Sequence, residues 1–222
     1  MARYKWPFAL LVVPFLASSC SNDTYESGDG DYSYLRADFV EAHTKAPNEI
    51  DYAVTDNRDS LALSPRYKVS WASQADTNYR GLLYYSKVDH HTAIASRFFQ
   101  VPVVAWQSKS KVKAVRTDPV VFESAWISRN RRYLNIGFSV KTARQNDGKK
   151  GQTIAVVATD SMELGGHIRQ LWLTLYHDQG GVPEYYSSKG YISVPLQRLP
   201  KGCHIRLTVR DYRLIVKKDF VK

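Results

Sequence analysis

Cysteine is scarce in this sequence, which has only Cys20 and Cys203 among its 222 residues. Two cysteines so far apart do not form the dense framework that stabilises disulfide-rich secreted domains. A bond between them would also require a fixed N-terminus, whereas the residues that follow Cys20 are polar and acidic. We therefore expect no disulfide, and we expect Cys203 to be reduced and to lie in or beside a strand.

The sequence also lacks the motifs of common enzymes. It has no H-E-x-x-H, no G-x-S-x-G, no phosphate-binding glycine loop and no Rossmann fingerprint. Two groups carry ligand-type side chains, Asp89-His90-His91 and His177-Asp178, but both fall at turn signals, where Asp caps the backbone without further chemistry. We predict a non-enzymatic protein without a metal or cofactor. Paired carboxylates that meet only in space are the open alternative.

An apolar run long enough to span a bilayer is missing too. The run at the N-terminus, Trp6–Ala17, has 12 residues and includes two prolines, whereas a spanning helix needs about 20. Arg3 and Lys5 precede it and Cys20 follows closely, which is the pattern of a cleaved secretory signal with a lipid-attachment cysteine. We predict a lipoprotein signal peptide over residues 1–19 and a lipid anchor on Cys20 that holds the protein to a membrane.

The residue three places before Cys20 is Ala17, where the bacterial lipid-attachment pattern usually has Leu. Ordinary secretion after cleavage near Ser19 is therefore the alternative. Residues 20–31 are expected to comprise the lipidated cysteine and a flexible tether. Ser21–Asp31 is polar and acidic and has no aliphatic side chain, so its burial could not offset the entropy of ordering.

Aromatic residues are abundant, with 15 Tyr, 8 Phe and 5 Trp. The segments between Gly, Pro, Asn and Asp clusters are short and alternating, and they are rich in Val, Ile, Thr and Tyr, which is typical of strands. We saw no amphipathic helix in the pattern. The sequence therefore predicts an all-β protein.

Residues 32–116 are expected to form a first domain, a small OB-like β-barrel. The alternative is a small open sheet packed on the second domain. Pro102, inside the last predicted strand, indicates an edge position or a bulge because proline cannot donate to the ladder. The predicted strands are Tyr34–His43, Ile50–Thr55, Leu61–Val69, Tyr79–Val88 and Ala93–Trp106.

Residues 117–222 are expected to form a second domain, a β-sandwich, because short strands recur at even spacing. Ser108–Val115, just before it, is polar enough to be a connection. Leu171, Leu173 and Leu175 share one face of a strand and should be buried. The predicted strands are Val120–Ile127, Tyr133–Lys141, Thr153–Thr159, Leu171–His177, Tyr185–Val194, Ile205–Arg210 and Leu214–Val216.

Positive charge is concentrated in the second domain. Asp118 to Lys222 carries 17 basic and 9 acidic residues, whereas Cys20 to Thr117 carries 12 of each. Basic residues that could form a polyanion-facing patch are Arg129, Arg131, Arg132, Arg206, Arg210, Arg213, Lys217 and Lys218. A solvated face without a ligand is the alternative, because many of these residues lie in turns or alternate along strands.

The lipoprotein signal, the acidic tether and the two all-β domains together resemble the NigD-like lipoproteins of Bacteroidetes, over nearly the whole mature chain. The resemblance rests on Asp118-Pro119-Val120, Trp126-Ile127, Tyr133–Ile136, Leu175–Gly181 and Tyr191–Leu196. It implies an OB-like domain followed by a β-sandwich. The naming member lies in a bacteriocin operon, which suggests an immunity role, and no catalytic residues carry over. The acidic tether also resembles the export signal of Bacteroides-group lipoproteins, which implies location at the outer membrane.

Two kinds of function follow from these expectations. The first is a non-enzymatic envelope lipoprotein that binds a protein or glycan, with Tyr84-Tyr85 and Tyr185-Tyr186 each presenting one tyrosine outward. The alternative is that outward tyrosines only support sheet pairing. The second is a polyanion- or glycan-binding protein that uses the basic second domain. The neutral first domain argues against nucleic acid, and a monomer is favoured.

Overall fold

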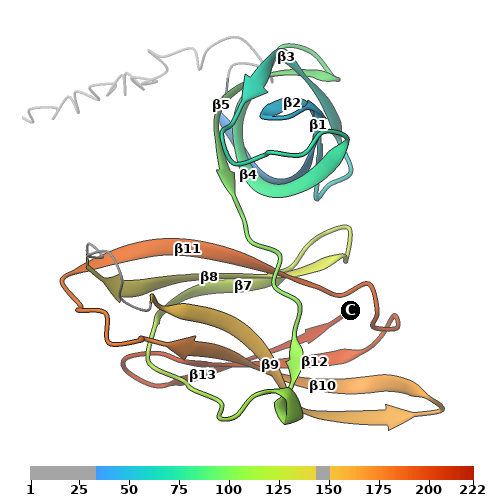
Figure 1. Cartoon of the computed structure of the whole chain (residues 1–222). Coiled ribbons are helices and arrows are strands. Elements are labelled where there is room, and N and C mark those ends of the chain that lie inside the picture. Colours follow the sequence, from blue (N-terminus) through green and yellow to red (C-terminus); the bar gives the residue numbers. More distant parts are fainter. Residues whose placement is uncertain (1–33, 144–150) are drawn as a thin grey trace, which may run out of the picture.

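The computed structural model describes residues 34–143 and 151–222. Two all-β units follow each other along the chain, a closed barrel and a two-sheet sandwich (Figure 1). The predicted fold class, an OB-like barrel followed by a β-sandwich, is therefore confirmed, and the alternative of an open first sheet is not found. Within the described residues, no helix has the length and apolar character needed to cross a membrane.

The barrel closes in the strand order β1-β2-β3-β5-β4. Closure depends on β1, which pairs antiparallel with both β2 and β4, and on a short parallel contact between β3 and β5. The strands are β1 (Arg36–Ala46), β2 (Glu49–Thr55), β3 (Ser60–Lys68), β4 (Thr77–Lys87) and β5 (Thr92–Gln100).

Alternating side chains fill the barrel. Val40, Leu61 and Leu83 are buried in one cluster with Tyr85, whose hydroxyl donates to Asp38 Oδ2 at 2.8 Å. Burial and the Asp38 carboxylate raise the pKa of Tyr85 well above its usual range. Of the predicted pair Tyr84-Tyr85, only Tyr84 retains appreciable exposure.

The connection between the two units differs from the prediction. β5 ends at Gln100, so Pro102 lies outside the strand. The chain there turns toward the sandwich, because the carbonyl of Pro102 accepts the Ser193 backbone N–H at 2.9 Å. The predicted connection Ser108–Val115 also contains regular structure, since β6 (Gln107–Ser108) is followed by a 3₁₀ helix, η1 (Lys109–Lys111).

The sandwich has a five-stranded sheet of order β13-β12-β10-β9-β6 and a three-stranded sheet of order β11-β8-β7. β10 and β12 are parallel, and β6 is parallel to β9. The remaining strands are β7 (Val121–Ile127), β8 (Tyr133–Thr142), β9 (Thr153–Leu164), β10 (His167–Asp178), β11 (Tyr186–Pro195), β12 (His204–Arg210) and β13 (Ile215–Val221).

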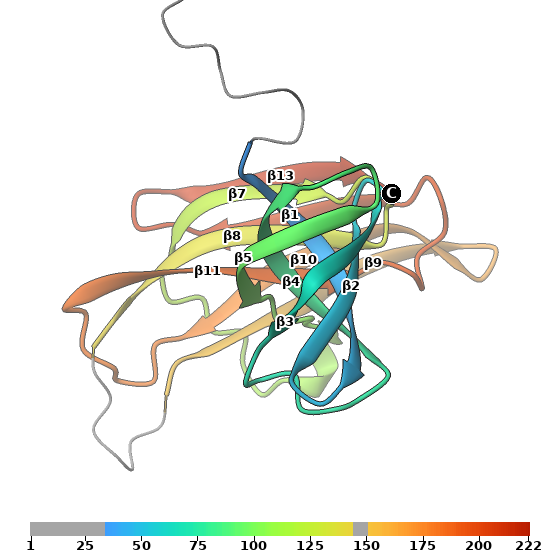
Figure 2. The ribbon, with the colours of Figure 1, turned by 90° about the horizontal axis from the view of Figure 1, so that it is seen from above.

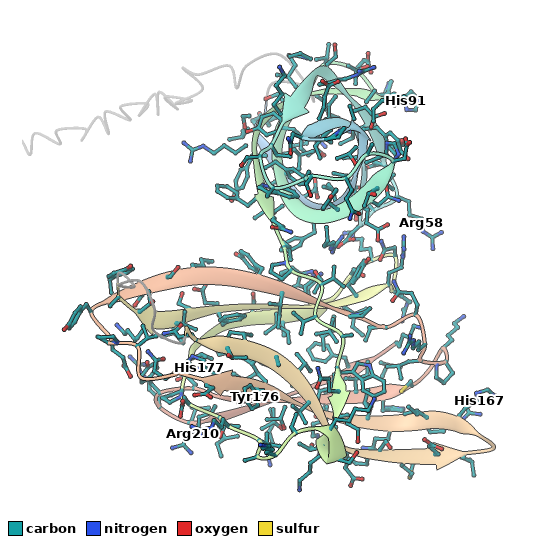
Figure 3. All side chains as sticks on the ribbon, in the orientation of Figure 1. Arg58, His91, His167, Tyr176, His177 and Arg210 are labelled. Carbon is teal, nitrogen blue, oxygen red and sulfur yellow. The ribbon has the colours of Figure 1, made fainter. Side chains whose placement is uncertain are left out.

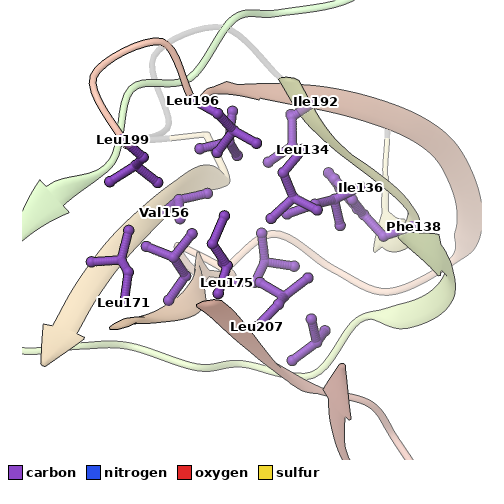
Figure 4. Close-up of a cluster of buried hydrophobic side chains, with 14 of the residues drawn as sticks. Leu134, Ile136, Phe138, Val156, Leu171, Leu175, Ile192, Leu196, Leu199 and Leu207 are labelled. Carbon is purple, nitrogen blue, oxygen red and sulfur yellow. The ribbon is translucent and has the colours of Figure 1, made fainter. Parts of the chain in front are cut away.

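The sandwich core lies between these two sheets (Figure 4). Leu171, Leu173 and Leu175 point into it with at most 2% of their surface exposed, as the alternation in β10 predicts. Cys203 is a free thiol buried beside β12, also as predicted. Burial raises the pKa of this thiol, which keeps it protonated.

The barrel rests on the outer face of the three-stranded sheet and covers only part of it (Figures 1 and 2). The Phe39 ring on β1 meets the rings of Trp126 and Tyr191 edge-on, with centroids 5.2 Å and 5.3 Å apart. Gly137 makes room for this packing, because a Cβ there would lie 2.8 Å from the Tyr191 ring.

Candidate binding surfaces

The predicted lipidation residue, Cys20, lies outside the described residues. The predicted basic residues are described, and the structure divides them into groups at different places on the sandwich. Arg129, Arg131 and Arg132 occupy the turn between β7 and β8. The other five lie in β12, in β13 or in the turn between these strands.

The β7–β8 turn faces the barrel and the end of β13. Arg132 forms an ion pair with Glu41 of β1, and the Arg131 side chain donates to the Val221 carbonyl at 3.3 Å. Asn130 shapes the turn, because its side-chain oxygen accepts from the Ser128 hydroxyl and from the Arg132 backbone N–H. At least one cation of this group is therefore neutralised by the barrel.

Arg206 is neutralised as well. It pairs side-on with Asp219 across β12 and β13, with Nε–Oδ1 and Nη2–Oδ2 distances of 2.7 Å and 3.2 Å. The Arg206 guanidinium lowers the pKa of the Asp219 carboxyl. A polyanion approaching this face would compete with that carboxylate.

Six of the eight predicted cations have no ion-pair partner among the described residues, because only Arg132 and Arg206 form ion pairs. Arg210 and Arg213 flank the β12–β13 turn, which lies at the end of the sandwich away from the barrel (Figure 3). Lys217 and Lys218 follow along β13, where they pair with Thr208 and Leu207 and so point to opposite faces. The eight predicted residues therefore do not form a single patch.

Exposed aromatic and aliphatic side chains gather at the same end as Arg210 and Arg213. We call this the distal surface. Its apolar members and their exposed fractions are Tyr185 (82%), Tyr186 (52%), Tyr212 (42%), Leu214 (58%) and Ile215 (54%). Both members of the predicted pair Tyr185-Tyr186 are exposed, because β11 begins only at Tyr186 and alternation does not yet apply at Tyr185.

The two loops of the distal surface are linked by one hydrogen bond. The Tyr212 hydroxyl donates to Glu184 Oε2 at 3.0 Å. Partial burial and the Glu184 carboxylate raise the pKa of Tyr212 to about 12, so this hydroxyl remains protonated at neutral pH. Tyr185 is fixed in turn by its backbone N–H, which donates to the Thr142 carbonyl at 3.0 Å.

Asp211 holds the turn that presents Tyr212 and Arg213. Its carboxylate accepts the backbone N–H groups of Arg213 at 3.0 Å and Phe122 at 2.8 Å. These two bonds lower the pKa of Asp211. A cavity of about 490 Å³ beside the turn is lined by residues that include Lys141 and Val121. The backbone of the distal surface and the Tyr212 side chain are thus held by hydrogen bonds.

The junction of barrel and sandwich holds the most buried charge, which the sequence did not reveal. Arg80 of β4 has 1% of its side chain exposed and forms two 2.7 Å bonds to the Asp56 carboxylate. It also donates to Ser193 Oγ and Asn135 Oδ1 of the sandwich, each at 3.2 Å. The Tyr133 ring lies 4.4 Å from the guanidinium carbon. Nothing near Arg80 in the sequence signals these partners, which lie 24 to 113 residues away.

Tyr133 extends the junction to Glu41. Its hydroxyl donates to Glu41 Oε1 at 2.5 Å. Burial and the Glu41 carboxylate raise the pKa of Tyr133 to about 12. The ring and the hydroxyl of Tyr133 are therefore both engaged by the barrel, and this part of the junction is a structural contact.

The histidine groups singled out in the sequence serve local structure. Asp89 Oδ1 accepts the backbone N–H groups of His91 and Thr92, and Asp178 Oδ1 accepts that of Gly180, as their turn positions predict. His177 is buried, and its Nδ1 lies 3.1 Å from the Asp118 carbonyl, which can only accept. No group of three or more His, Cys, Asp or Glu side chains in the described part of the chain could hold a metal ion.

Comparison with known proteins bears on the sandwich and on the whole fold. Residues 102–217 match the family model of the NigD-like C-terminal beta sandwich domain. A solved NigD-like immunity protein from Bacteroides caccae shares 22% identity and a TM-score of 0.63, covering 86% of this chain and 98% of its own. Comparison with curated proteins gives no match.

Two further solved structures share the fold. A protein of unknown function from Bacteroides vulgatus has 15% identity and a TM-score of 0.63, covering 85% of this chain and 91% of its own. A predicted lipoprotein from Bacteroides fragilis has 12% identity and a TM-score of 0.56, covering 84% of this chain and 96% of its own. At these identities the likeness concerns the fold of both units.

Proposed function

The chain belongs to the NigD-like family, and from this premise we propose that it is a non-enzymatic binding protein of the cell envelope. Its distal surface would contact an acidic protein partner. The observation that carries the proposal is the meeting of three exposed tyrosines with Arg210 and Arg213, which have no ion-pair partner among the described residues. Tyrosine and arginine are the residue types most enriched where protein interfaces concentrate their binding energy.

Charge indicates the chemistry of the partner. The nearest acids of the distal surface, Asp211 and Glu184, are already engaged by backbone N–H groups and by Tyr212. Asp211 still attracts Arg213 electrostatically, but neither Arg210 nor Arg213 forms an ion pair with a described residue, so both guanidinium groups can pair with an external anion. Carboxylates on a protein would pair with them while the tyrosines supply the apolar contact.

Location and anchoring extend this proposal. The predicted lipid on Cys20 would attach the chain to a membrane, and the structural similarity to a predicted lipoprotein of Bacteroides fragilis supports this. The outer membrane is the location that the acidic tether favours. One relative is an immunity protein by name, so an exported toxin is a candidate for the acidic partner.

A photocrosslinking amino acid placed at Tyr185 or Leu214 of the full chain, in cells of its source, tests the contact. We expect discrete protein adducts from both positions. The matched control positions are Lys45 and Arg97, which are exposed on the barrel. Combined Arg210→Glu and Arg213→Glu substitutions should abolish the adducts. The same adducts from the barrel positions, or none from the distal ones, would refute a distal contact.

Anchoring has a separate test. Cells labelled with radioactive palmitate should incorporate label into the wild-type chain and not into Cys20→Ser, which should leave the membrane fraction. An unlabelled wild-type chain would contradict the lipid anchor without affecting the distal contact.

The second candidate, a polyanion-binding basic domain, has less support. Arg132 and Arg206 are neutralised by Glu41 and Asp219, and the remaining cations are spread over the sandwich. Retention on heparin should therefore be lost below about 0.5 M salt, where simple ion pairing is largely screened. Retention above that concentration would favour this alternative.

A further inference from the structure

A second candidate site lies on the sandwich, away from the distal surface. A cavity of about 650 Å³ opens between the connection from the barrel and the chain that leaves β11. This volume is within the range of small-molecule sites, about 300–1,000 Å³. Side chains that line it include Trp106, Gln107, Lys111, Pro195, Gln197 and Arg198.

Both walls of this cavity are attached to the hydrophobic core. Trp106 packs against the sandwich core, with part of its indole left exposed. Opposite it, the buried side chains of Leu196 and Leu199 anchor a turn that is closed by a 3.0 Å backbone hydrogen bond between them. Gln197 and Arg198 are the two central residues of that turn and are exposed. The walls are therefore fixed to the core while their polar ends are open.

Most polar side chains of the cavity have no side-chain partner in the protein; the exception is Ser108, whose Oγ lies 3.0 Å from Ser110 Oγ. Among the described residues, none accepts from the Trp106 indole N–H, and none pairs with the side chains of Gln107, Lys111, Gln197 or Arg198. No acidic side chain lines the cavity. Asp160 and Glu163 line a neighbouring hollow, which shares Trp106 and Ser108 with this cavity. The same space is thus faced by two cations, two side-chain amides and one indole N–H. None of these groups has a hydrogen-bond or ion-pair partner among the described residues.

This combination matches the chemistry of an acidic sugar. An indole face stacks on the apolar face of a pyranose ring, side-chain amides donate to and accept from hydroxyls, and Arg binds a carboxylate through two parallel bonds. A nucleotide would also use an aromatic ring and cations. The sequence, however, has no glycine loop to hold phosphates, whereas two amides suit a polyhydroxylated ring.

We propose that this cavity binds a hexuronic acid unit of a glycan, with Trp106 under the sugar ring and Arg198 and Lys111 on its carboxylate. The site does not depend on the proposed protein contact at the distal surface. It gives the chain a second binding specificity, for an acidic saccharide, at a separate place on the sandwich.

Titration of the full chain in mild detergent with a hyaluronan tetrasaccharide tests the proposal. The Trp indole N–H signals of the protein are followed by NMR, and Trp106→Phe identifies the Trp106 signal. We expect that signal to shift saturably with hyaluronan tetrasaccharide. Cellotetraose, which has no carboxylate, should bind at least about tenfold more weakly, because a charged hydrogen bond is worth roughly 1.5–3 kcal/mol.

Arg198→Gln and Lys111→Gln change exposed side chains, so both variants should fold. Each should weaken tetrasaccharide binding by about tenfold. The matched controls Arg97→Gln and Lys45→Gln remove the same charges from the barrel and should leave the affinity unchanged.

Three results would overturn the proposal. They are equal affinity for cellotetraose, equal loss of affinity in the barrel controls, and no shift of the Trp106 signal with either saccharide. Tighter binding of AMP or of inorganic sulfate would also overturn it, since each would assign the cavity to a different anion.

Discussion

The junction of barrel and sandwich and the distal surface use the same residue types for opposite purposes. At the junction, Arg80 has 1% of its side chain exposed and Tyr133 is 6% exposed as a residue. At the distal surface, Tyr185 is 82% exposed and Arg213 has no ion-pair partner among the described residues. At the junction, arginine and tyrosine are buried and bonded to other residues of the protein. At the distal surface, the same residue types are exposed and available to a binding partner.

Satisfaction of the buried charge explains the difference. All three nitrogens of the Arg80 guanidinium donate to side chains, and these come from both units. Asp56 is its ionic partner, so removing Asp56 would leave a desolvated charge. The distal cations remain in water, and their pairing with an external anion has a low desolvation cost.

The strongest test of this comparison is Arg80→Ala. It leaves the Asp56 carboxylate, which is 14% exposed, without its bidentate partner. We expect a loss of about 3–5 kcal/mol in the free energy of unfolding, the cost of breaking a buried ion pair from one side. Urea unfolding followed by circular dichroism measures it.

Arg66→Ala is the matched control. Arg66 also pairs with a carboxylate, Glu49, but it is 56% exposed. Its removal should not change the free energy of unfolding measurably. Equal effects of the two substitutions would show that the junction has no special role in stability.

Gly137→Ala tests the aromatic part of the junction. The added Cβ would lie 2.8 Å from the Tyr191 ring and 2.9 Å from Ser124 Oγ. Displacing Tyr191 from Phe39 should cost about 1–3 kcal/mol of stability, as overpacking does in a filled core. Gly190→Ala, in the neighbouring strand, adds the same methyl group where no atom lies within 4 Å. Its thermal midpoint should stay at the wild-type value.

Alkaline pH should weaken the junction through Tyr133. Its pKa is raised from 10.0 to about 12 in the folded protein. Above pH 10 the unfolded chain therefore releases this proton first, and stability falls between about pH 10 and 12. Tyr133→Phe has no such proton, so its unfolding free energy should fall less steeply with pH over this window. Parallel pH profiles would mean that the Tyr133 hydroxyl is not held by Glu41.

The smallest expected effect concerns exposed charge. Asp219→Asn removes the carboxylate that neutralises Arg206. Because both side chains are largely in water, stability should not change, while elution from heparin should move to slightly higher salt. Arg213→Gln should move elution the other way. A clear loss of stability in Asp219→Asn would show that the Arg206–Asp219 pair contributes to the free energy of unfolding as the buried Arg80–Asp56 pair does, contrary to the prediction.

Local pattern predicted much of the fold. Alternation in Leu171–Tyr176 placed three leucines in the core, because successive side chains of a strand point to opposite faces. Turn residues such as Asp89 and Asp178 were interpreted correctly, because an aspartate caps backbone groups close to it in sequence. The predicted strand end at Trp106 was wrong, because β5 ends at Gln100 and a hydrogen bond from the Ser193 N–H to the Pro102 carbonyl joins the chain to the sandwich there.

The candidate sites were only partly predictable. Arg210 and Arg213 are exposed, as expected of a surface patch, although the sequence gave no reason to group them with tyrosines. The sequence predicted one outward tyrosine in the pair Tyr185-Tyr186, whereas both are exposed. The run Tyr212-Arg213-Leu214-Ile215 was a usable signal, because three apolar residues around a turn cannot all be buried. The cavity at Trp106 had no signal, since its walls come from segments about ninety residues apart.

Composition, periodicity and turn chemistry determined by themselves that this protein is built of strands, with its positive charge in the second unit. Those properties depend on neighbours within a few residues. Tertiary structure alone decided which cations are neutralised, as Arg80, Arg132 and Arg206 are, and which remain open, as Arg198 and Arg213 do. The reason is that an ion pair depends on distance in space, and folding brings Arg132 to Glu41 across 91 residues of chain.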